Sequence, residues 1–199
     1  MKEFLERISK LSPARLKLLA AELQQKVEGL QRAQHAPIAI VGMGCNIPGE
    51  ARTPDALWQM LCDGTDAIRE IPIERWDIEE WYDPDPDTPG KMATRWGGFV
   101  SRAEYFDADF FGIAPREALS MDPQHRLWLE TAWEALENAG HSAQSLRGSS
   151  TGVYVGLCSQ DHYHMMLSGD PGRWDAYLAT GNANSVLSGR LSYLLGAHG

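Results

Sequence analysis

The sequence has little cysteine and no long apolar run. Its three cysteines form no C-x-x-C pair and have no spacing typical of a zinc site; they are Cys45, Cys62 and Cys158. This usage predicts a reduced compartment, with the cytoplasm as the default. No stretch approaches the roughly 18–20 uncharged apolar residues of a membrane span, and the N-terminus has no apolar signal core. The sequence therefore predicts neither a membrane-spanning helix nor a secretory signal.

Positive charge is also scarce. The chain has 18 Lys and Arg against 27 Asp and Glu, and this net charge of −9 disfavours nucleic acid or an anionic membrane as a partner. Residues 1–35 carry seven basic and four acidic residues, so +3, and the remainder carries eleven and twenty-three, so −12. The pattern of the sequence changes at the same place, from amphipathic helical spacing to a stretch with many Gly, Pro and Trp residues. Two units are predicted: an N-terminal segment over 1–35 and a domain over 36–199.

The first 35 residues have the pattern of two amphipathic helices. Apolar residues at Phe4, Ile8 and Leu11 form one short stripe, and Ser12-Pro13 is typical of a new helix start. The second stripe follows at spacings of three and four and consists of Leu16, Leu19, Leu23, Val27 and Leu30. The segment from Gly29 through His35 is expected to end this helix. So small a pair cannot bury enough surface alone, so it must dimerise, bind a partner or cap the following domain.

The rest of the chain alternates apolar strand patterns with helical ones, which favours the α/β class. Residues 37–41 and 151–158 are predicted as buried strands, and residues 96–100 as a short strand. Helices are predicted over 53–62, over 115–139 with an interruption at Asp122-Pro123, and over 184–195; Thr53 is the expected N-cap of the first, and Gly140 ends the second. Residues 63–112 have the composition of a long ordered loop region.

Three apparent motifs fail on inspection. The glycines after residues 37–41 lack the third glycine of a dinucleotide fingerprint, since Ile47 occupies its place. Asp83, Asp85 and Asp87 lack the glycine and glutamate of a calcium loop, so they indicate a rigid Pro-Asp turn. Cys158 with His162 and His164 matches no standard zinc site, and Cys158 is expected at the end of a buried strand rather than as a nucleophile. No bound metal or cofactor is predicted.

Six stretches resemble the ketosynthase domain of modular type I polyketide synthases. Four of them are Pro37-Ile-Ala-Ile-Val-Gly-Met-Gly-Cys45, Asp83-Pro-Asp-Pro-Asp-Thr-Pro-Gly-Lys91, Arg95-Trp-Gly-Gly-Phe99 and Phe106-Asp-Ala-Asp-Phe-Phe-Gly-Ile113. The two most specific are Pro115-Arg-Glu-Ala-Leu-Ser-Met-Asp-Pro-Gln-His-Arg126 and Thr180-Gly-Asn-Ala-Asn-Ser-Val-Leu-Ser-Gly-Arg-Leu-Ser-Tyr193. The resemblance runs continuously from about Pro37 to Gly199. Departures are minor: Asn46-Ile47 replaces the usual Arg-Phe, and His125 replaces a usual Gln.

The resemblance implies an incomplete thiolase-like fold, a homodimer and a decarboxylative Claisen condensation. In the family, a cysteine takes an acyl chain from the phosphopantetheine arm of an acyl carrier protein, and two histidines assist the extender unit. The nucleophile motif of the family follows shortly after the block that ends at Leu194-Leu195-Gly196. No cysteine of this chain matches it, so the catalytic residues are expected beyond Gly199 and the chain alone is expected to be inactive.

Residues 1–35 resemble the two-helix docking segments at the starts of polyketide synthase subunits. The match rests on Ile8-Ser-Lys-Leu-Ser-Pro13 and the leucine-rich stretch after it. It implies that the two stripes bind the C-terminal docking helix of an upstream subunit, with charged rims selecting the partner. Two other functions stay open: a pure docking module without enzymatic function, and a non-elongating ketosynthase remnant.

Overall fold

The structure is a computed structural model and describes residues 8–9 and 11–198. The chain forms two compact units, Met1–Ile40 and Val41–Gly199. Each unit is described by itself.

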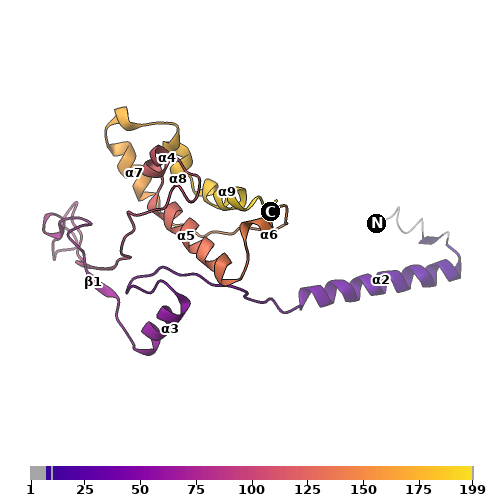
Figure 1. The fold of residues 1–199 in the computed structure, drawn as a ribbon. Helices are drawn as coiled ribbons and strands as arrows, with labels where there is room; N and C mark the ends of the chain where they lie inside the picture. Colours follow the sequence, from indigo (N-terminus) through magenta and orange to yellow (C-terminus); the bar gives the residue numbers. More distant parts are fainter. Residues whose placement is uncertain (1–7, 10, 199) are drawn as a thin grey trace. The chain divides into compact units, whose positions relative to one another are not determined.

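The first unit is built around one long helix, α2 (Pro13–Gln34) (Figure 1). Its start is the predicted one, because Ser12 accepts hydrogen bonds at its hydroxyl from the Arg15 N–H (3.4 Å) and at its carbonyl from the Leu16 N–H (2.9 Å). The helix continues past Gly29 and ends at Gln34, within the run that was expected to end it. Of the predicted first helix, only Ile8, Ser9 and Leu11 lie within the described residues; Ile8 and Ser9 are helical, and Phe4 lies outside them.

In the second unit, helix starts follow the predicted capping chemistry. The Thr53 hydroxyl accepts a hydrogen bond from the Ala56 N–H (3.1 Å) at the start of α3 (Pro54–Cys62). The predicted interruption at Asp122-Pro123 divides two helices, α4 (Pro115–Ser120) and α5 (Pro123–Asn138). Asp122 caps α5 by accepting a bond from the Gln124 N–H (2.8 Å), and Gly140, with φ of 72°, follows its end. These predictions are confirmed.

The remaining helices are all shorter than α5, and α9 is the longest of them. They are α6 (Ala143–Leu146), α7 (Asp161–Ser168), α8 (Tyr177–Asn182) and α9 (Asn184–Leu195), with two short 3₁₀ helices, η1 (Ile78–Glu80) and η2 (Pro171–Arg173). Helix α9 has the predicted bounds. Helices α4, α7 and α8 gather near the start of α5 (Figure 1), and α9 contacts both α6 and α8.

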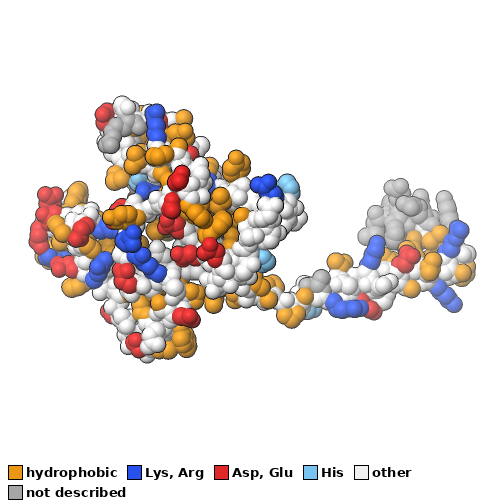
Figure 2. All heavy atoms as spheres, viewed as in Figure 1, with side chains coloured by type: hydrophobic (Ala, Val, Ile, Leu, Met, Phe, Trp, Pro, Cys, Tyr) orange, Lys and Arg blue, Asp and Glu red, His pale blue; other side chains and the backbone are white. Residues whose placement is uncertain are grey.

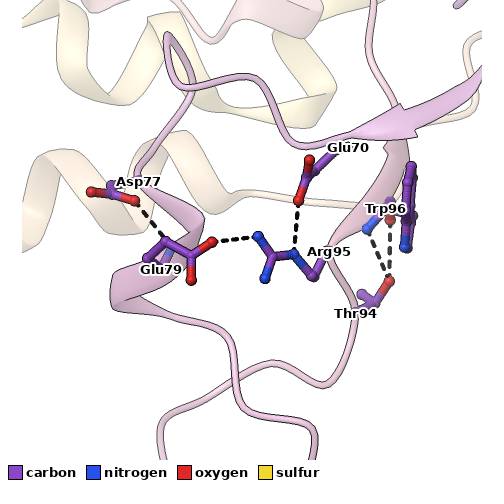
Figure 3. A network of polar contacts seen from close by, with 6 residues as sticks. All are labelled: Glu70, Asp77, Glu79, Thr94, Arg95 and Trp96. Carbon is purple, nitrogen blue, oxygen red and sulfur yellow. Dashed lines mark hydrogen bonds and ion pairs between the residues drawn. The ribbon is translucent and has the colours of Figure 1, made fainter.

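The described sheet has two short strands in the loop region 63–112. Strands β1 (Ile68–Glu70) and β2 (Trp96–Gly98) pair antiparallel, with Glu70 opposite Trp96. Arg95, beside β2, bridges Glu70 on β1 (2.8 Å) and Glu79 on η1 (Figure 3). These two hydrogen bonds raise the pKa of the Arg95 guanidinium, Glu79 contributing first. Arg95 thus ties the two-stranded sheet to η1.

The predicted buried strands 37–41 and 151–158 are wrong in this structure. Both segments are outside any helix or strand, and Ile38 and Tyr154 are 96% and 92% exposed. An apolar run forms a strand only when a neighbour satisfies its N–H and C=O groups, and no described backbone segment pairs with either run. For the same reason Cys158 is exposed rather than buried at a strand end.

The glycines after residue 41 serve close packing against α5. A Cβ at Gly42 would lie 2.4 Å from the Ala135 carbonyl oxygen, and one at Gly44 would lie 2.5 Å from that of Thr131. Between them, the Met43 N–H donates to Asn138 Oδ1 (3.0 Å). The two glycines that resemble part of a nucleotide fingerprint thus let the chain lie directly on a helix.

The core of the second unit centres on α5 and α9. Its buried members are Phe111, Met121, Leu129, Ala132, Leu191 and Leu195. Phe111 stacks on Phe106 with ring centroids 5.3 Å apart, and Phe110 meets Phe111 and Trp133 edge-on. The core therefore joins the 106–113 block to the helices that carry the two most specific sequence blocks.

Candidate functional site

A buried polar junction lies where α4, α5 and α8 meet. The buried polar side chains of the described residues are Ser120, Asp122, His125 and Asn182. They come from the end of α4, the start of α5 and the end of α8. Burying polar groups is costly unless they are hydrogen-bonded, so their partners decide what the junction does.

Asn182 connects three segments. Its Nδ2 donates to the Ser120 carbonyl (2.9 Å) and the Leu178 carbonyl (2.8 Å), and its Oδ1 lies 2.8 Å from His162 Nδ1 on α7. The Asn182 side chain thus bonds a carbonyl at the end of α4, a carbonyl of its own helix α8 and the ring of His162. These contacts join positions up to 62 residues apart in sequence.

Backbone packing closes the same junction. The Asp122 N–H donates to the Gly181 carbonyl (3.0 Å), and a Cβ at Gly181 would lie 2.7 Å from the Ser120 carbonyl oxygen. Only a residue without a side chain fits there. This position is in the Thr180-Gly-Asn block of the sequence.

Gly181→Ala is expected to destabilise the protein by roughly 1–3 kcal/mol, because the buried backbone of Ser120 must shift. Gly189→Ala, in helix α9, is the matched control. Its Cβ would meet nothing within 4 Å, and Ala is the better helix former by about 1 kcal/mol, so this change is expected to stabilise. Thermal unfolding of both variants in the intact protein measures the difference; equal effects would contradict the packing argument.

An ion pair anchors α9 to this junction. Arg190 Nη1 lies 2.6 Å from Glu117 Oε1 on α4, and Arg190 Nη2 donates to the Thr180 carbonyl (3.1 Å). Both charged side chains are largely buried. Arg126 on α5 donates to the Met121 carbonyl (2.9 Å), and burial lowers the pKa of its guanidinium. The two most specific sequence blocks, 115–126 and 180–193, are therefore bonded to each other.

His125 is the least satisfied member of the junction. It is fully buried, and neither ring nitrogen has a hydrogen-bond partner among the described residues. Burial lowers the pKa of this imidazole, Asp122 opposes the shift, and Arg190 and His162 add to it. Burial therefore disfavours the protonated form of His125.

The stability of the folded protein is expected to fall as pH drops below about 6.5, the pKa of an unfolded histidine. Below that pH the unfolded chain binds a proton that folded His125 resists, until the pH reaches its lowered folded pKa. Above about pH 6.5, His125 binds no proton in either the folded or the unfolded chain, so it adds no pH dependence to stability. The loss is limited to about 1.4 kcal/mol per pH unit for one proton.

His125→Gln is expected to remove this part of the pH dependence. Exposed His164→Gln is the control and should retain it. Urea unfolding of the intact protein between pH 7.5 and 5.5 measures both variants. An unchanged slope in His125→Gln would show that other groups carry the pH dependence.

The cysteines and the aspartates singled out in the sequence are not among the residues of this junction. The three cysteines are free, Cys62 and Cys158 being exposed and Cys45 half-buried. Within the described part of the chain, no group of three His, Cys, Asp or Glu side chains is arranged to hold a metal ion. The Asp83 and Asp85 carboxylates accept bonds from the backbone N–H two residues later (2.9 and 3.1 Å), as a Pro-Asp turn requires.

Of the predicted docking residues, the second stripe lies on α2, and Ile8 and Leu11 precede this helix. Leu16, Leu23, Val27 and Leu30 are exposed, and Ile8, Leu11 and Leu19 are half-buried. Hydrophobic and basic side chains share the visible surface of this helix (Figure 2). Helix α2 thus presents the apolar side chains that the sequence pattern placed on one face.

Sequence reasoning did not find the roles of Asn182, Gly181, Arg190 and Glu117. Their signal was present, because all four lie in the two blocks that carried the resemblance most specifically. Pairing those blocks requires knowing that α8 packs on α4 and that Arg190 of α9 reaches Glu117 of α4.

Comparison with known proteins agrees with the resemblance. The family model "Beta-ketoacyl synthase, N-terminal domain" matches residues 35–199. One of the phenolphthiocerol/phthiocerol polyketide synthase subunits of Mycobacterium tuberculosis is 48% identical over 199 residues, which are all of this chain and 11% of that protein. Polyketide synthase GfsB of Streptomyces halstedii is 48% identical over 188 residues, 92% of this chain and 3% of that protein.

Solved structures with the same fold are ketosynthase domains. The oxazolomycin ketosynthase domain of Streptomyces albus JA3453 has a TM-score of 0.70 and 36% identity, over 80% of this chain and 28% of that one. The ketosynthase from module 6 of the bacillaene synthase of Bacillus subtilis has a TM-score of 0.66 and 37% identity, over 81% and 25%. The fold is thus a thiolase-like ketosynthase fold in incomplete form. Among the described residues, no helix has the length and apolar character to cross a membrane. The chain belongs to the beta-ketoacyl synthase family, as an N-terminal part of a modular polyketide synthase ketosynthase.

Proposed function

We propose that the parent subunit of this chain elongates a polyketide by decarboxylative Claisen condensation. The observation that carries the proposal is the match of residues 35–199 to the beta-ketoacyl synthase N-terminal domain, with relatives that are polyketide synthases. The chain spans 11% of the length of the mycobacterial relative, so the activity belongs to the parent subunit. A homodimer in the cytoplasm is part of the same proposal.

The chemistry has two transfers. A cysteine thiolate attacks the acyl thioester of the carrier protein, forming a new thioester and releasing the phosphopantetheine thiol. A malonyl-type extender then loses CO₂, and its enolate attacks the acyl-enzyme carbonyl. A C–C bond forms, the C–S bond to the enzyme breaks, and the cysteine leaves as thiolate. Histidine N–H donors stabilise the oxyanion and enolate charges.

Within this scheme, residues 36–199 supply scaffold rather than reacting groups. The nucleophile and both histidines are proposed to follow Gly199. Helix α9 directly precedes that region, and its position is fixed by Arg190 to Glu117 on α4 and by its buried face, including Leu191 and Leu195. A rigid α9 would hold the nucleophile segment in register with the rest of the domain.

The 199-residue chain alone is expected to show no condensation and no stable acyl-enzyme. Cys158 is free and exposed, and its surroundings in the sequence do not match the nucleophile motif of the family. Intact-mass spectrometry after incubation with acyl-carrier substrates measures this, with the parent subunit as the positive control. Stoichiometric acylation at Cys158 would overturn the assignment. The coding sequence just past Gly199 is a second check, since a Thr-Ala-Cys-Ser element there is required.

We further propose that residues 1–35 bind the C-terminal docking helix of an upstream subunit. The observation that supports this is the exposed stripe of α2, with Leu23 47% and Val27 45% exposed. Arg15, Lys17 and Lys26 lie on the same helix, and Lys10 lies outside the described residues. A basic rim beside an apolar stripe favours an amphipathic partner helix with acidic flanks. This second function could operate without the condensation.

A further inference from the structure

A pocket of about 620 Å³ lies between α4, α7 and the segment around η2. Its apolar wall is formed by Leu119, Met165, Met166 and Trp174, and its polar lining includes Arg116, Asp170, Asp175 and His162. The acidic and basic groups have partners inside the protein. Arg116 Nε lies 2.9 Å from Asp175 Oδ2, and Asp170 Oδ1 accepts the Gly172 N–H (2.9 Å).

The tautomer of His162 follows from its bond to Asn182. Asn182 Nδ2 donates both of its hydrogens to carbonyl oxygens, those of Ser120 and Leu178. Exchanging the nitrogen and oxygen of this amide would place Oδ1 against those two carbonyl oxygens, which are acceptors only. Its Oδ1 is therefore an acceptor, and His162 Nδ1 must carry the proton of their 2.8 Å bond.

In the tautomer that carries its proton on Nδ1, the other ring nitrogen, Nε2, is an acceptor. No residue within the described ranges 8–9 and 11–198 forms a hydrogen bond with its Nε2. The lining of the pocket thus includes an apolar wall and His162, whose ring is oriented by its bond to Asn182. Such a surface suits a carbon chain that bears a hydrogen-bond donor.

We propose that this pocket binds an acyl chain carrying a hydroxyl group, with the hydroxyl donating to His162 Nε2. The inference rests on the proposed function, which supplies an acyl chain as the substrate. The methionines and Leu119 would cover the carbon chain. A ketone or a methylene in the same place has no proton to donate, so His162 would discriminate hydroxyacyl substrates from their oxidised and deoxy counterparts.

The test compares acylation of the parent subunit by N-acetylcysteamine thioesters of hexanoate, 3-oxohexanoate, 3-hydroxyhexanoate and 5-hydroxyhexanoate. One net hydrogen bond predicts a roughly three- to ten-fold higher kcat/KM for at least one hydroxyacyl thioester. His162→Asn retains a side-chain N–H for Asn182 but has no atom in the place of Nε2, so the preference should fall close to one. His164→Asn, the same change two residues further along α7, lies outside the pocket and should keep it.

Acylation without preference in the unaltered subunit would overturn the inference and leave the proposed condensation intact. This outcome depends on no variant, so misfolding of His162→Asn cannot obscure it. An equal preference in His162→Asn and the unaltered subunit would also overturn the assignment to His162. Failure of every thioester to acylate the subunit would instead refute the proposed function, and the inference would fall with it.

Discussion

Residues 36–199 expressed alone are expected to aggregate or to melt without a sharp transition. The cause is the pair of apolar runs at 37–41 and 151–158, which remain unpaired. Ile38, Ile40 and Tyr154 are each more than 80% exposed, and no backbone–backbone hydrogen bond in the described chain satisfies either run. Unpaired, apolar, extended segments are templates for association with other chains.

A groove in the second unit shows where further structure is expected to pack. A cavity of about 470 Å³ separates the start of that unit, at Val41 and Gly42, from the segment at Val153 and Tyr154. Trp128 and Ala132 on α5, with Leu191 and Leu195 on α9, also line it. A strand placed here would cover the apolar lining and could use the unpaired backbone groups on either side.

Size-exclusion chromatography with light scattering, followed by calorimetry, measures this expectation. Ile38→Lys and Tyr154→Lys should raise the soluble monomeric fraction, because charge blocks edge-to-edge pairing. Leu119→Lys is the matched control: Leu119 is 78% exposed but lies in α4, whose backbone is paired, so it should help less. A soluble monomer of unaltered 36–199 with a cooperative melt would contradict the prediction and show that this half of the domain closes by itself.

Local chemistry could be predicted from the sequence, and long-range pairing could not. Thr53 and Asp122 cap the helices expected of them, and α9 has its predicted bounds, because each signal lies within a few residues of its effect. The apolar runs at 37–41 and 151–158 satisfy the pattern of a strand, but pairing depends on segments far away in the sequence or outside this chain. The pattern alone does not reveal whether such a partner is present.

The polar junction shows the same limit at a single site. Asn182 and Ser120 are 62 residues apart, and neither residue type in its local setting indicates burial or a shared hydrogen bond. The resemblance marked both blocks as specific without saying that they touch. Arg190 of one block also helps to lower the pKa of His125, which lies in the other block and is a departure from the family pattern.

Replacing a central leucine of α2 by aspartate is expected to abolish most of the docking affinity. Leu19→Asp or Leu23→Asp removes an anchor worth roughly 1.5–3 kcal/mol on burial and places a charge in the contact, so affinity should fall by about 10- to 100-fold or more. Two such anchors could supply much of a micromolar affinity, about −8 kcal/mol. Titration calorimetry of the chain against the C-terminal tail of the upstream subunit measures this.

Leu18→Asp is the matched control for the stripe. Leu18 is adjacent to Leu19 and 63% exposed, but helical spacing places it on the opposite face from Leu16 and Leu23. The same substitution there should leave affinity nearly unchanged, while circular dichroism verifies that all variants keep their helix content.

The salt dependence of binding distinguishes the contribution of the basic rim from that of the apolar stripe. Binding should weaken between 50 and 300 mM NaCl in so far as Arg15, Lys17 and Lys26 attract acidic flanks; these concentrations bracket a Debye length of roughly 10 Å. Because such charges select partners more than they add affinity, Lys17→Glu should cost less with the native tail than Leu23→Asp does. If neither leucine change weakens binding while the helices stay folded, the stripe is not the docking face, and residues 1–35 are a cap on the ketosynthase.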